Sequence, residues 1–335
     1  MTKYRRGHDR DELLADVAEM YYIDNLTQAE VSRAFGLTRS AISRMLTEAR
    51  EKGIVNISVN RPSSFDTGLE EALIEQFNLL DAHVLSLQQE PKYDILCRRL
   101  GQAAAQVLGQ MLEPHTSCGV SWGANVSATI EVLQVPNPIP MRFVQLGGVL
   151  GPSSHAYNAQ ALVEMMARRV GGDGIYIYSP FLVEKAETAH SILGNPDVRE
   201  AIEAGKQCDM ALLGIGTITN ENYSSLFLAG HISRDTIDEL RTAGAVGDVS
   251  GRHFNVEGKA TISPLNDRLI CIALDDLLAI PIRFGVSGGH AKVESILGAL
   301  RGGYVNQLVT DSITAEAVLA LANEEVVNKK ESYYA

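Results

Sequence analysis

Basic and hydroxyl side chains recur on one short segment near the start of the chain. Arg39, Ser40, Ser43 and Arg44 fall at helical spacing, so they share one exposed helix face. Arginine forms bidentate pairs with guanine, and serine or threonine hydroxyls bind phosphate oxygens. This segment is therefore predicted to contact DNA. The predicted DNA-binding residues are Thr27, Gln28, Thr38, Arg39, Ser40, Ser43 and Arg44.

Three glycine-rich segments could hold an anion. They are Cys118–Asn125, 213–219 and Val286–Lys292. Glycine lets backbone N–H groups approach a phosphate closely, and Lys292 would add a point charge one turn into its helix. Ser121 and Ser287 would add hydroxyl donors. No segment has a Walker A motif, and tight turns that need glycine only for packing remain an alternative to a phosphate-sized site.

The densest polar stretch is Gly247–Gly258, with Asp248, Arg252, His253 and Glu257. Its carboxylates could accept sugar hydroxyls. Asp248, His253 and Glu257 could also form the acid–base set of an isomerase, or the stretch could be turn chemistry alone. Trp122 is the only tryptophan, and both a core position and stacking on a sugar remain open.

The first predicted elements are three helices. Apolar spacing predicts a helix over Leu13–Ile23. Thr27 and Glu30 then form a Ser/Thr-x-x-Glu capping box for a helix ending at Gly36, and Thr38 caps a third helix, Arg39–Lys52. This is the helix-turn-helix pattern, followed by a predicted strand, Ile54–Asn60. Its predicted core residues are Val31, Phe35, Leu37, Ile42 and Met45.

Strands and helices alternate through the rest of the chain. This order predicts an open, Rossmann-like α/β fold whose parallel sheet is covered on both faces, with ligands at the carboxyl ends of its strands. The predicted strands are Ala82–Leu87, Ser117–Ser121, Phe143–Leu146, Gly174–Tyr178, Met210–Gly214, Ala245–Val249, Phe254–Val256, Ile280–Val286 and Gln307–Thr310. The predicted helices are Phe65–Leu79, Tyr93–Leu112, Ala124–Leu133, His155–Val170, a region to Ala204, Arg234–Ala243, Ala291–Arg301 and Ala315–Ala322.

Charge is distributed unevenly over the 335 residues. The whole chain has a formal net charge of −12, which taken alone argues against a nucleic-acid partner. Residues 1–61, however, hold ten basic and nine acidic side chains, so the rest of the chain has a net charge of −13. The sequence thus predicts a DNA-binding domain at 1–61, a linker at Arg61–Ser64, and an effector-binding and oligomerisation domain at 62–335.

The remaining composition favours a cytoplasmic protein that uses no metal or cofactor. The four cysteines are far apart and form no CxxC or Cys/His cluster. The N-terminus has no secretory h-region, and no charge-free stretch is long enough to span a bilayer, so no membrane partner is expected.

The chain resembles the SorC-type sugar-binding transcriptional regulators of bacteria over about residues 13–322. The resemblance is carried by TQAEVSRAFGLTRSAISRMLTEAREKGIV, GVSWGANV, VQLGG, ALLGIGTI, AVGDVSGRHFNVEG and GVSGGHAKVESILGALRGGYVNQLVTDSITAEAVL. It implies an effector domain similar to glucosamine-6-phosphate deaminase and ribose-5-phosphate isomerase. It also implies tetramers, as dimers of dimers, on operator DNA, controlled by a phosphorylated sugar or polyol.

The resemblance also implies individual site residues. Gly119–Asn125 matches the family's effector loop, Asp248 the acid that holds ligand hydroxyls, and Lys292 the lysine near the effector phosphate. Arg252 and His253 depart from the aromatic residues of many relatives, and Asn255 replaces a common Asp. The implied effector-binding residues are Gly119, Ser121, Trp122, Gly123, Ala124, Asn125, Gly147, Gly216, Asp248, Gly288 and Lys292.

Two functions follow from these observations. The first is a DNA-binding transcriptional regulator, not an enzyme, that controls a carbohydrate or polyol catabolic operon in response to a phosphorylated sugar. The alternative is a sugar-phosphate isomerase or deaminase with an appended helical domain.

Overall fold

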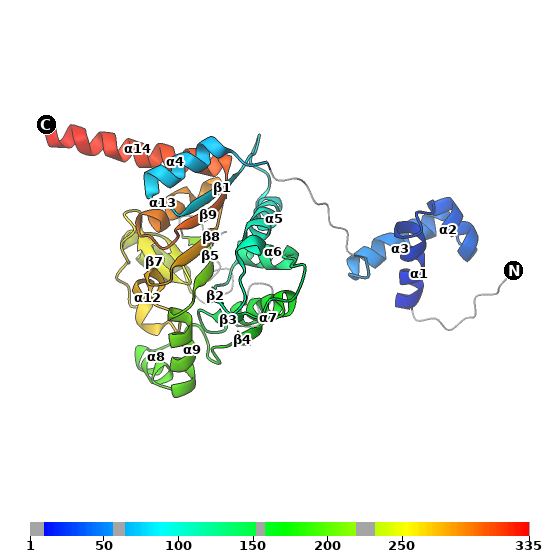
Figure 1. The fold of residues 1–335 in the computed structure, drawn as a ribbon, viewed down its shortest axis with the longest axis horizontal. Coiled ribbons are helices and arrows are strands. Elements are labelled where there is room, and N and C mark those ends of the chain that lie inside the picture. The colour runs from blue at the N-terminus through cyan, green and yellow to red at the C-terminus, as the bar shows by residue number, and fades with distance from the viewer. Residues whose placement is uncertain (1–9, 56–63, 152–157, 219–231, 335) are drawn as a thin grey trace. The chain divides into compact units, whose positions relative to one another are not determined.

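The computed structural model describes residues 10–55, 64–151, 158–218 and 232–334, with side chains to residue 324. The chain divides into two compact units, Met1–Arg61 and Pro62–Ala335. Figure 1 shows the small unit as helices alone and the large unit as a sheet with helices around it.

The small unit has three helices around its own apolar core. They are α1 (Arg10–Tyr22), α2 (Gln28–Phe35) and α3 (Arg39–Glu51). The buried core side chains are Leu14, Val17, Ala18, Val31, Ile42, Met45, Leu46 and Ala49, with Phe35 packed against them.

The prediction that Leu37 joins this core was wrong, because its side chain is 38% exposed. Gly36 ends α2 in the left-handed conformation, with φ of 67°. The N–H groups of Gly36 and Leu37 both donate to the carbonyl of Ser32, and this cap holds the turn that carries Leu37 outward. The predicted strand 54–60 lies mostly outside the described residues, although Ile54 and Val55 pack against the helical core.

The large unit is built on a sheet with a parallel path of seven strands in the order β1-β9-β8-β5-β2-β3-β4. An antiparallel hairpin, β6–β7, extends from β5. The strands are β1 (Asp81–Leu85), β2 (Ser117–Val120), β3 (Arg142–Gln145), β4 (Asp173–Ile175), β5 (Met210–Thr217), β6 (Ala245–Val249), β7 (Arg252–Asn255), β8 (Ile282–Val286) and β9 (Gln307–Asp311).

Helices cover both faces of this sheet, as the alternating pattern predicts. Figure 1 shows α5, α6 and α7 along one side, and α4, α13 and α14 along the other. Each side encloses its own buried apolar cluster. The helices are α4 (Thr67–Phe77), α5 (Tyr93–Met111), α6 (Ala124–Val132), α7 (Ala159–Val170), α8 (Ala186–Leu193), α9 (Pro196–Lys206), α11 (Arg234–Thr242), α12 (Leu274–Leu278), α13 (Val293–Arg301) and α14 (Ser312–Tyr334), with short 3₁₀ turns η3 (Asn266–Arg268) and η4 (His290–Lys292).

Several residues lie in secondary-structure elements that differ from the predicted ones. β5 continues to Thr217 because its end pairs with β6, so Gly216 lies inside a strand and not in a loop after one. Gly119 lies within β2, as the predicted strand Ser117–Ser121 implies. Lys292 belongs to η4 and precedes α13, one turn earlier than expected. The predicted helical region before Ala204 is two helices, because Asn195 caps a new one that starts at Pro196.

Candidate functional site

The N-termini of α2 and α3 hold the predicted DNA-binding residues, and side-chain caps position both. The Thr27 hydroxyl accepts the Glu30 N–H at 3.3 Å, and the Glu30 carboxylate accepts the Thr27 N–H at 2.8 Å, so the predicted capping box is formed. Thr38 accepts the Ala41 N–H at 3.2 Å at the start of α3. These local bonds define where each helix begins.

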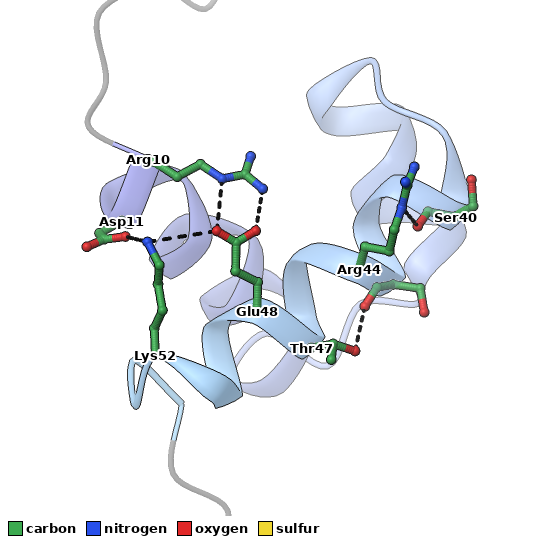
Figure 2. Close-up of polar contacts among 8 residues, drawn as sticks. Arg10, Asp11, Ser40, Arg44, Thr47, Glu48 and Lys52 are labelled. Carbon is green, nitrogen blue, oxygen red and sulfur yellow. Dashed lines mark hydrogen bonds and ion pairs between the residues drawn. The ribbon is translucent and has the colours of Figure 1, made fainter.

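The side chains of α3 separate into two sets, which Figure 2 shows on different parts of the helix. Toward its C-terminal end, Glu48 accepts two bonds from Arg10, and Lys52 pairs with Asp11. The Arg10 hydrogen bonds lower the pKa of Glu48, because they favour its ionised form. Glu48 is thereby paired with Arg10 of α1, and Asp11 of α1 is paired with Lys52, the residue that follows α3.

The N-terminal half of α3 keeps its positive charge. Arg39, Ser40, Ser43 and Arg44 are all exposed. Arg44 Nε donates only to the carbonyl of Ser40, at 3.4 Å, and among the described residues no carboxylate pairs with Arg39 or Arg44. Both guanidinium groups therefore remain available for an anionic partner.

An open groove connects the starts of α2 and α3. It is lined by Tyr21, Tyr22, Asn25, Leu26, Thr27, Gln28 and Arg39, so it brings together three of the predicted DNA-binding residues. The contribution of α1 to this groove was not predicted from the sequence. The two adjacent tyrosines at the end of that helix are the signal that could have found it.

In the large unit, Gly216 and Asp248 face each other across β5 and β6. A Cβ atom on Gly216 would lie 2.0 Å from Asp248 Oδ1, so glycine is what lets the carboxylate lie over β5. Asp248 Oδ2 accepts the N–H of Gly251 at 3.0 Å. The half-buried carboxylate is thus held in one position at the end of the strand.

The turn of the β6–β7 hairpin brings the first glycine-rich segment to the same place. Ser250 and Gly251 have φ of 51° and 75°, as in a two-residue type I′ turn. The Ser250 hydroxyl donates to Ser121 Oγ at 3.2 Å, and a Cβ on Gly251 would contact the Phe181 ring at 2.4 Å. The hairpin turn and the Ser121 loop therefore pack together.

Trp122 is a core residue. Its side chain is 5% exposed, and its ring lies edge-on to Phe181 with centroids 4.4 Å apart. A Cβ on Gly147 would lie 2.8 Å from the indole, so Gly147 provides room for it. Because the ring is covered in this way, stacking on a sugar is disfavoured. Trp122 instead packs against Phe181 and the backbone at Gly147.

Lys292 is a buried cation, with 6% of its surface exposed. Its ammonium donates to the Ile215 carbonyl at 2.7 Å and lies 5.6 Å from the centre of the Tyr93 ring. Burial lowers the pKa of Lys292, opposed by Cys97 and Asp248. Within the described residues no carboxylate is in ion-pair contact with it. The charge is therefore only partly compensated.

The other predicted effector-site residues have different roles. Gly123 begins α6 with φ of 131°, followed by Ala124 and by Asn125, whose buried Oδ1 has no hydrogen-bond partner in the described part of the chain. Ser287 Oγ lies 3.4 Å from the Ile215 carbonyl. A Cβ on Gly288 would meet Asp311, and one on Gly119 would meet Leu146 at 2.7 Å, so these two glycines serve packing.

The acid–base set considered for an isomerase is not assembled. Asp248 and His253 are cross-strand neighbours, but Glu257 is exposed in the turn after β7. No described side chain bonds to either ring nitrogen of His253, and Arg252 instead donates to main-chain carbonyls, including Asn266 O at 2.8 Å. Across the described ranges, no cluster of three metal-ligating side chains is found, and no helix is both long and apolar enough to cross a membrane.

Comparison with known proteins identifies the family of the chain. Residues 61–320 match the protein family described as "Putative sugar-binding domain". The chain is 33% identical over 317 residues to the transcriptional regulator LsrR of Enterobacter sp. (strain 638), covering 93% of this chain and 94% of that protein. It is 30% identical over 312 residues to the deoxyribonucleoside regulator of Bacillus subtilis (strain 168), covering 93% and 98%.

A solved structure supports both the fold and the assignment. The full-length sorbitol operon regulator SorC from Klebsiella pneumoniae superposes with a TM-score of 0.70 at 27% identity, covering 93% of this chain and all of that one. These relatives are transcriptional regulators and not enzymes. The chain therefore belongs to the SorC/DeoR-type family of sugar-binding transcriptional regulators.

Proposed function

We propose that this regulator binds operator DNA through its small unit and a phosphorylated sugar or polyol through its large unit, and that it controls a carbohydrate or polyol catabolic operon. The relatives support the general role, since the names of two of them refer to a sorbitol operon and to deoxyribonucleosides. The observation that carries the effector class is the buried ammonium of Lys292, which has no carboxylate partner among the described residues.

The proposed effector supplies an anionic partner for the Lys292 ammonium. A buried charge is costly unless it is paired, and an anionic ligand group would pair it. The large unit is acidic, so its overall field repels an anion and local donors have to attract one. Lys292 and the α6 N-terminus at Gly123–Asn125 are such donors, while Asp248 accepts hydrogen bonds from sugar hydroxyls.

The DNA-binding surface is the exposed N-terminal half of α3 with the groove beside it. Arg39 and Arg44 have no described acidic partner, and Ser40, Ser43 and Thr38 add hydroxyls. We assign base contacts to the two arginines, and phosphate contacts to Thr27, Gln28 and the hydroxyl groups.

A single unit of this size makes few phosphate contacts, so useful affinity requires more than one copy on the DNA. We infer a homo-oligomer, a tetramer built as a dimer of dimers. Analytical ultracentrifugation of the full chain checks this, and a monomer at micromolar concentration that still binds DNA tightly would contradict it.

The effector is identified by a melting screen of the full chain. Phosphorylated pentoses, hexoses and polyols are tested at millimolar concentration, because a ligand that binds the folded state raises Tm in proportion to the logarithm of its concentration over Kd. At least one compound should raise Tm. If none does, the class of effector proposed here is wrong.

The two sites are then separated by substitution. DNA is selected from a random duplex library with the unsubstituted protein, and binding is measured by fluorescence anisotropy. Arg44→Ala should weaken DNA binding and leave sugar-phosphate affinity unchanged, whereas Lys292→Ala should do the reverse. Arg168→Ala removes the same charge from an exposed site on the large unit and is the matched control. Swapped outcomes would refute both assignments.

A further inference from the structure

A row of side chains crosses the hairpin beyond Asp248. Gly216 pairs with Asp248 across β5 and β6, and Asp248 pairs with His253 across β6 and β7. Phe254 forms an antiparallel bridge with Ala260, and the Thr261 N–H donates to the His253 carbonyl at 2.9 Å, so His253 also faces Thr261. Directly opposed residues in antiparallel strands share one face. Asp248, His253 and Thr261 therefore lie on one face in that order.

The other face of the hairpin is already occupied. A Cβ on Gly247 would lie 2.3 Å from the Cβ of Ser295 in α13, and the Phe254 ring lies close to Gly298 of the same helix. Phe254 also contacts Tyr304, with ring centroids 5.2 Å apart. The row with His253 consequently points away from α13.

This row has an unusual concentration of polar atoms that lack partners. His253 is 1% exposed and Thr261 is 4% exposed. In the described part of the chain six buried side-chain atoms have no hydrogen-bond partner, and four of them lie here: both ring nitrogens of His253, Thr261 Oγ1 and Asn266 Oδ1. The Asn266 amide donates to the Thr261 carbonyl at 2.7 Å, so it adjoins the row.

Buried polar groups without partners cost free energy, so such a concentration indicates a missing ligand group. Burial lowers the pKa of His253, which leaves a neutral ring with one donor and one acceptor nitrogen. Asn266 Oδ1 only accepts, and the Thr261 hydroxyl does both. Hydroxyl groups match this set, whereas a second phosphate, which mainly accepts, does not.

The row is also continuous with the proposed effector site. Asp248 is half-buried and is the open end of the row. Its carboxylate raises the pKa of both Lys292 and His253, so it lies within electrostatic reach of each. A ligand whose phosphate meets Lys292 and whose hydroxyl meets Asp248 would extend its next hydroxyl toward His253.

We propose that His253, Thr261 and Asn266 form a second polar subsite that binds the hydroxyl-bearing end of the effector, distal to its phosphate. This inference rests on the proposed function of the large unit. It makes His253 a specificity determinant: effectors with a free hydroxyl at this end bind, and bisphosphates are disfavoured.

The test uses the full chain and isothermal titration calorimetry. The probes are inorganic phosphate, which reaches only the Lys292 end, and ribose 5-phosphate, glucosamine 6-phosphate and sorbitol 6-phosphate. The variants are Thr261→Val and His253→Leu, each of which removes buried polar atoms that have no protein partner and so should fold. Thr310→Val is the matched control, because Thr310 is also buried with an unpartnered hydroxyl but lies in β9.

We expect Thr261→Val and His253→Leu each to weaken the best sugar phosphate by about tenfold, the equivalent of one lost hydrogen bond in a buried site. Inorganic phosphate should bind all variants within about twofold of the unsubstituted protein, and Thr310→Val should match it for every probe. Unchanged sugar-phosphate affinity in both variants would mean that the cluster holds internal water only. That result would overturn this inference but not the proposed function of the large unit. If the unsubstituted protein bound no probe, the proposed effector class would fail together with the inference.

Discussion

Replacing Lys292 by methionine should make the effector-free protein more stable while removing effector binding. The ammonium is buried, with one carbonyl and the Tyr93 ring as its described contacts. Methionine has a similar length and no charge to desolvate. The Ile215 carbonyl would keep Ser287 Oγ as a neighbour at 3.4 Å. The substitution therefore leaves no new buried charge behind.

The expected change in the free energy of unfolding is the gain from removing a buried charge minus the loss of the cation–π contact. Replacing buried charges with apolar groups of similar volume is neutral to stabilising by about 1–4 kcal/mol. The lost cation–π contact offsets about 0.5–2 kcal/mol of that. A net gain of about 1 kcal/mol raises the Tm of a unit of this size by about 2–4 °C.

The measurement is Tm by differential scanning calorimetry, without ligand, between pH 7 and pH 10. Because the pKa of Lys292 is lowered from 10.5 in the folded state, the unfolded chain holds this proton more firmly, and the destabilising contribution of Lys292 decreases as pH rises toward 10.5. The Tm difference between variant and unsubstituted protein should therefore shrink toward pH 10. Lys206→Met, at a partly exposed lysine paired with Glu203 and Asp276, is the control and should not raise Tm. A lower Tm for Lys292→Met at pH 7 would show that the lysine supports the fold, which would refute the reasoning.

Three further predictions concern single contacts. Gly216→Ala should displace the Asp248 carboxylate and weaken sugar-phosphate binding at least tenfold by calorimetry, whereas Gly109→Ala, with no atom closer than 3.7 Å, should not. Thr27→Ala should remove the capping box and destabilise the small unit by about 1 kcal/mol in circular-dichroism melts, with Thr27→Ser restoring most of it. His253→Gln should reduce the fall in Tm below pH 6.5. Because the pKa of His253 is lowered in the folded state, the unfolded chain binds the proton more readily there, and this destabilises the unsubstituted protein. An unchanged Tm-versus-pH curve would contradict this.

Local signals account for what could be predicted in the fold. The capping residues Thr27 and Thr38, and the alternation of strand and helix patterns, involve neighbours within a few positions of each other. Leu37 shows the limit even at short range, because the geometry of the Gly36 cap directs it outward although its apolar character predicts burial.

The candidate site was harder to predict because its contacts join distant segments. Gly216 was expected in a loop, but pairing with β6 extends β5 past it. Trp122 is covered by Phe181, which lies far along the chain, so its glycine-rich setting alone leaves both interpretations open. Neither composition nor residue spacing indicates that side-chain atoms of His253 and Thr261 lack hydrogen-bond partners in the described part of the chain.

By itself the sequence determined the division of charge between a balanced small unit and an acidic large one, the helix caps, and the α/β alternation, because each depends on composition or on near neighbours. Only the tertiary structure decided that Lys292 is a buried cation and that Asp248, His253 and Thr261 form one row. Desolvation and cross-strand register arise when residues far apart in the chain pack together, and no local pattern encodes them.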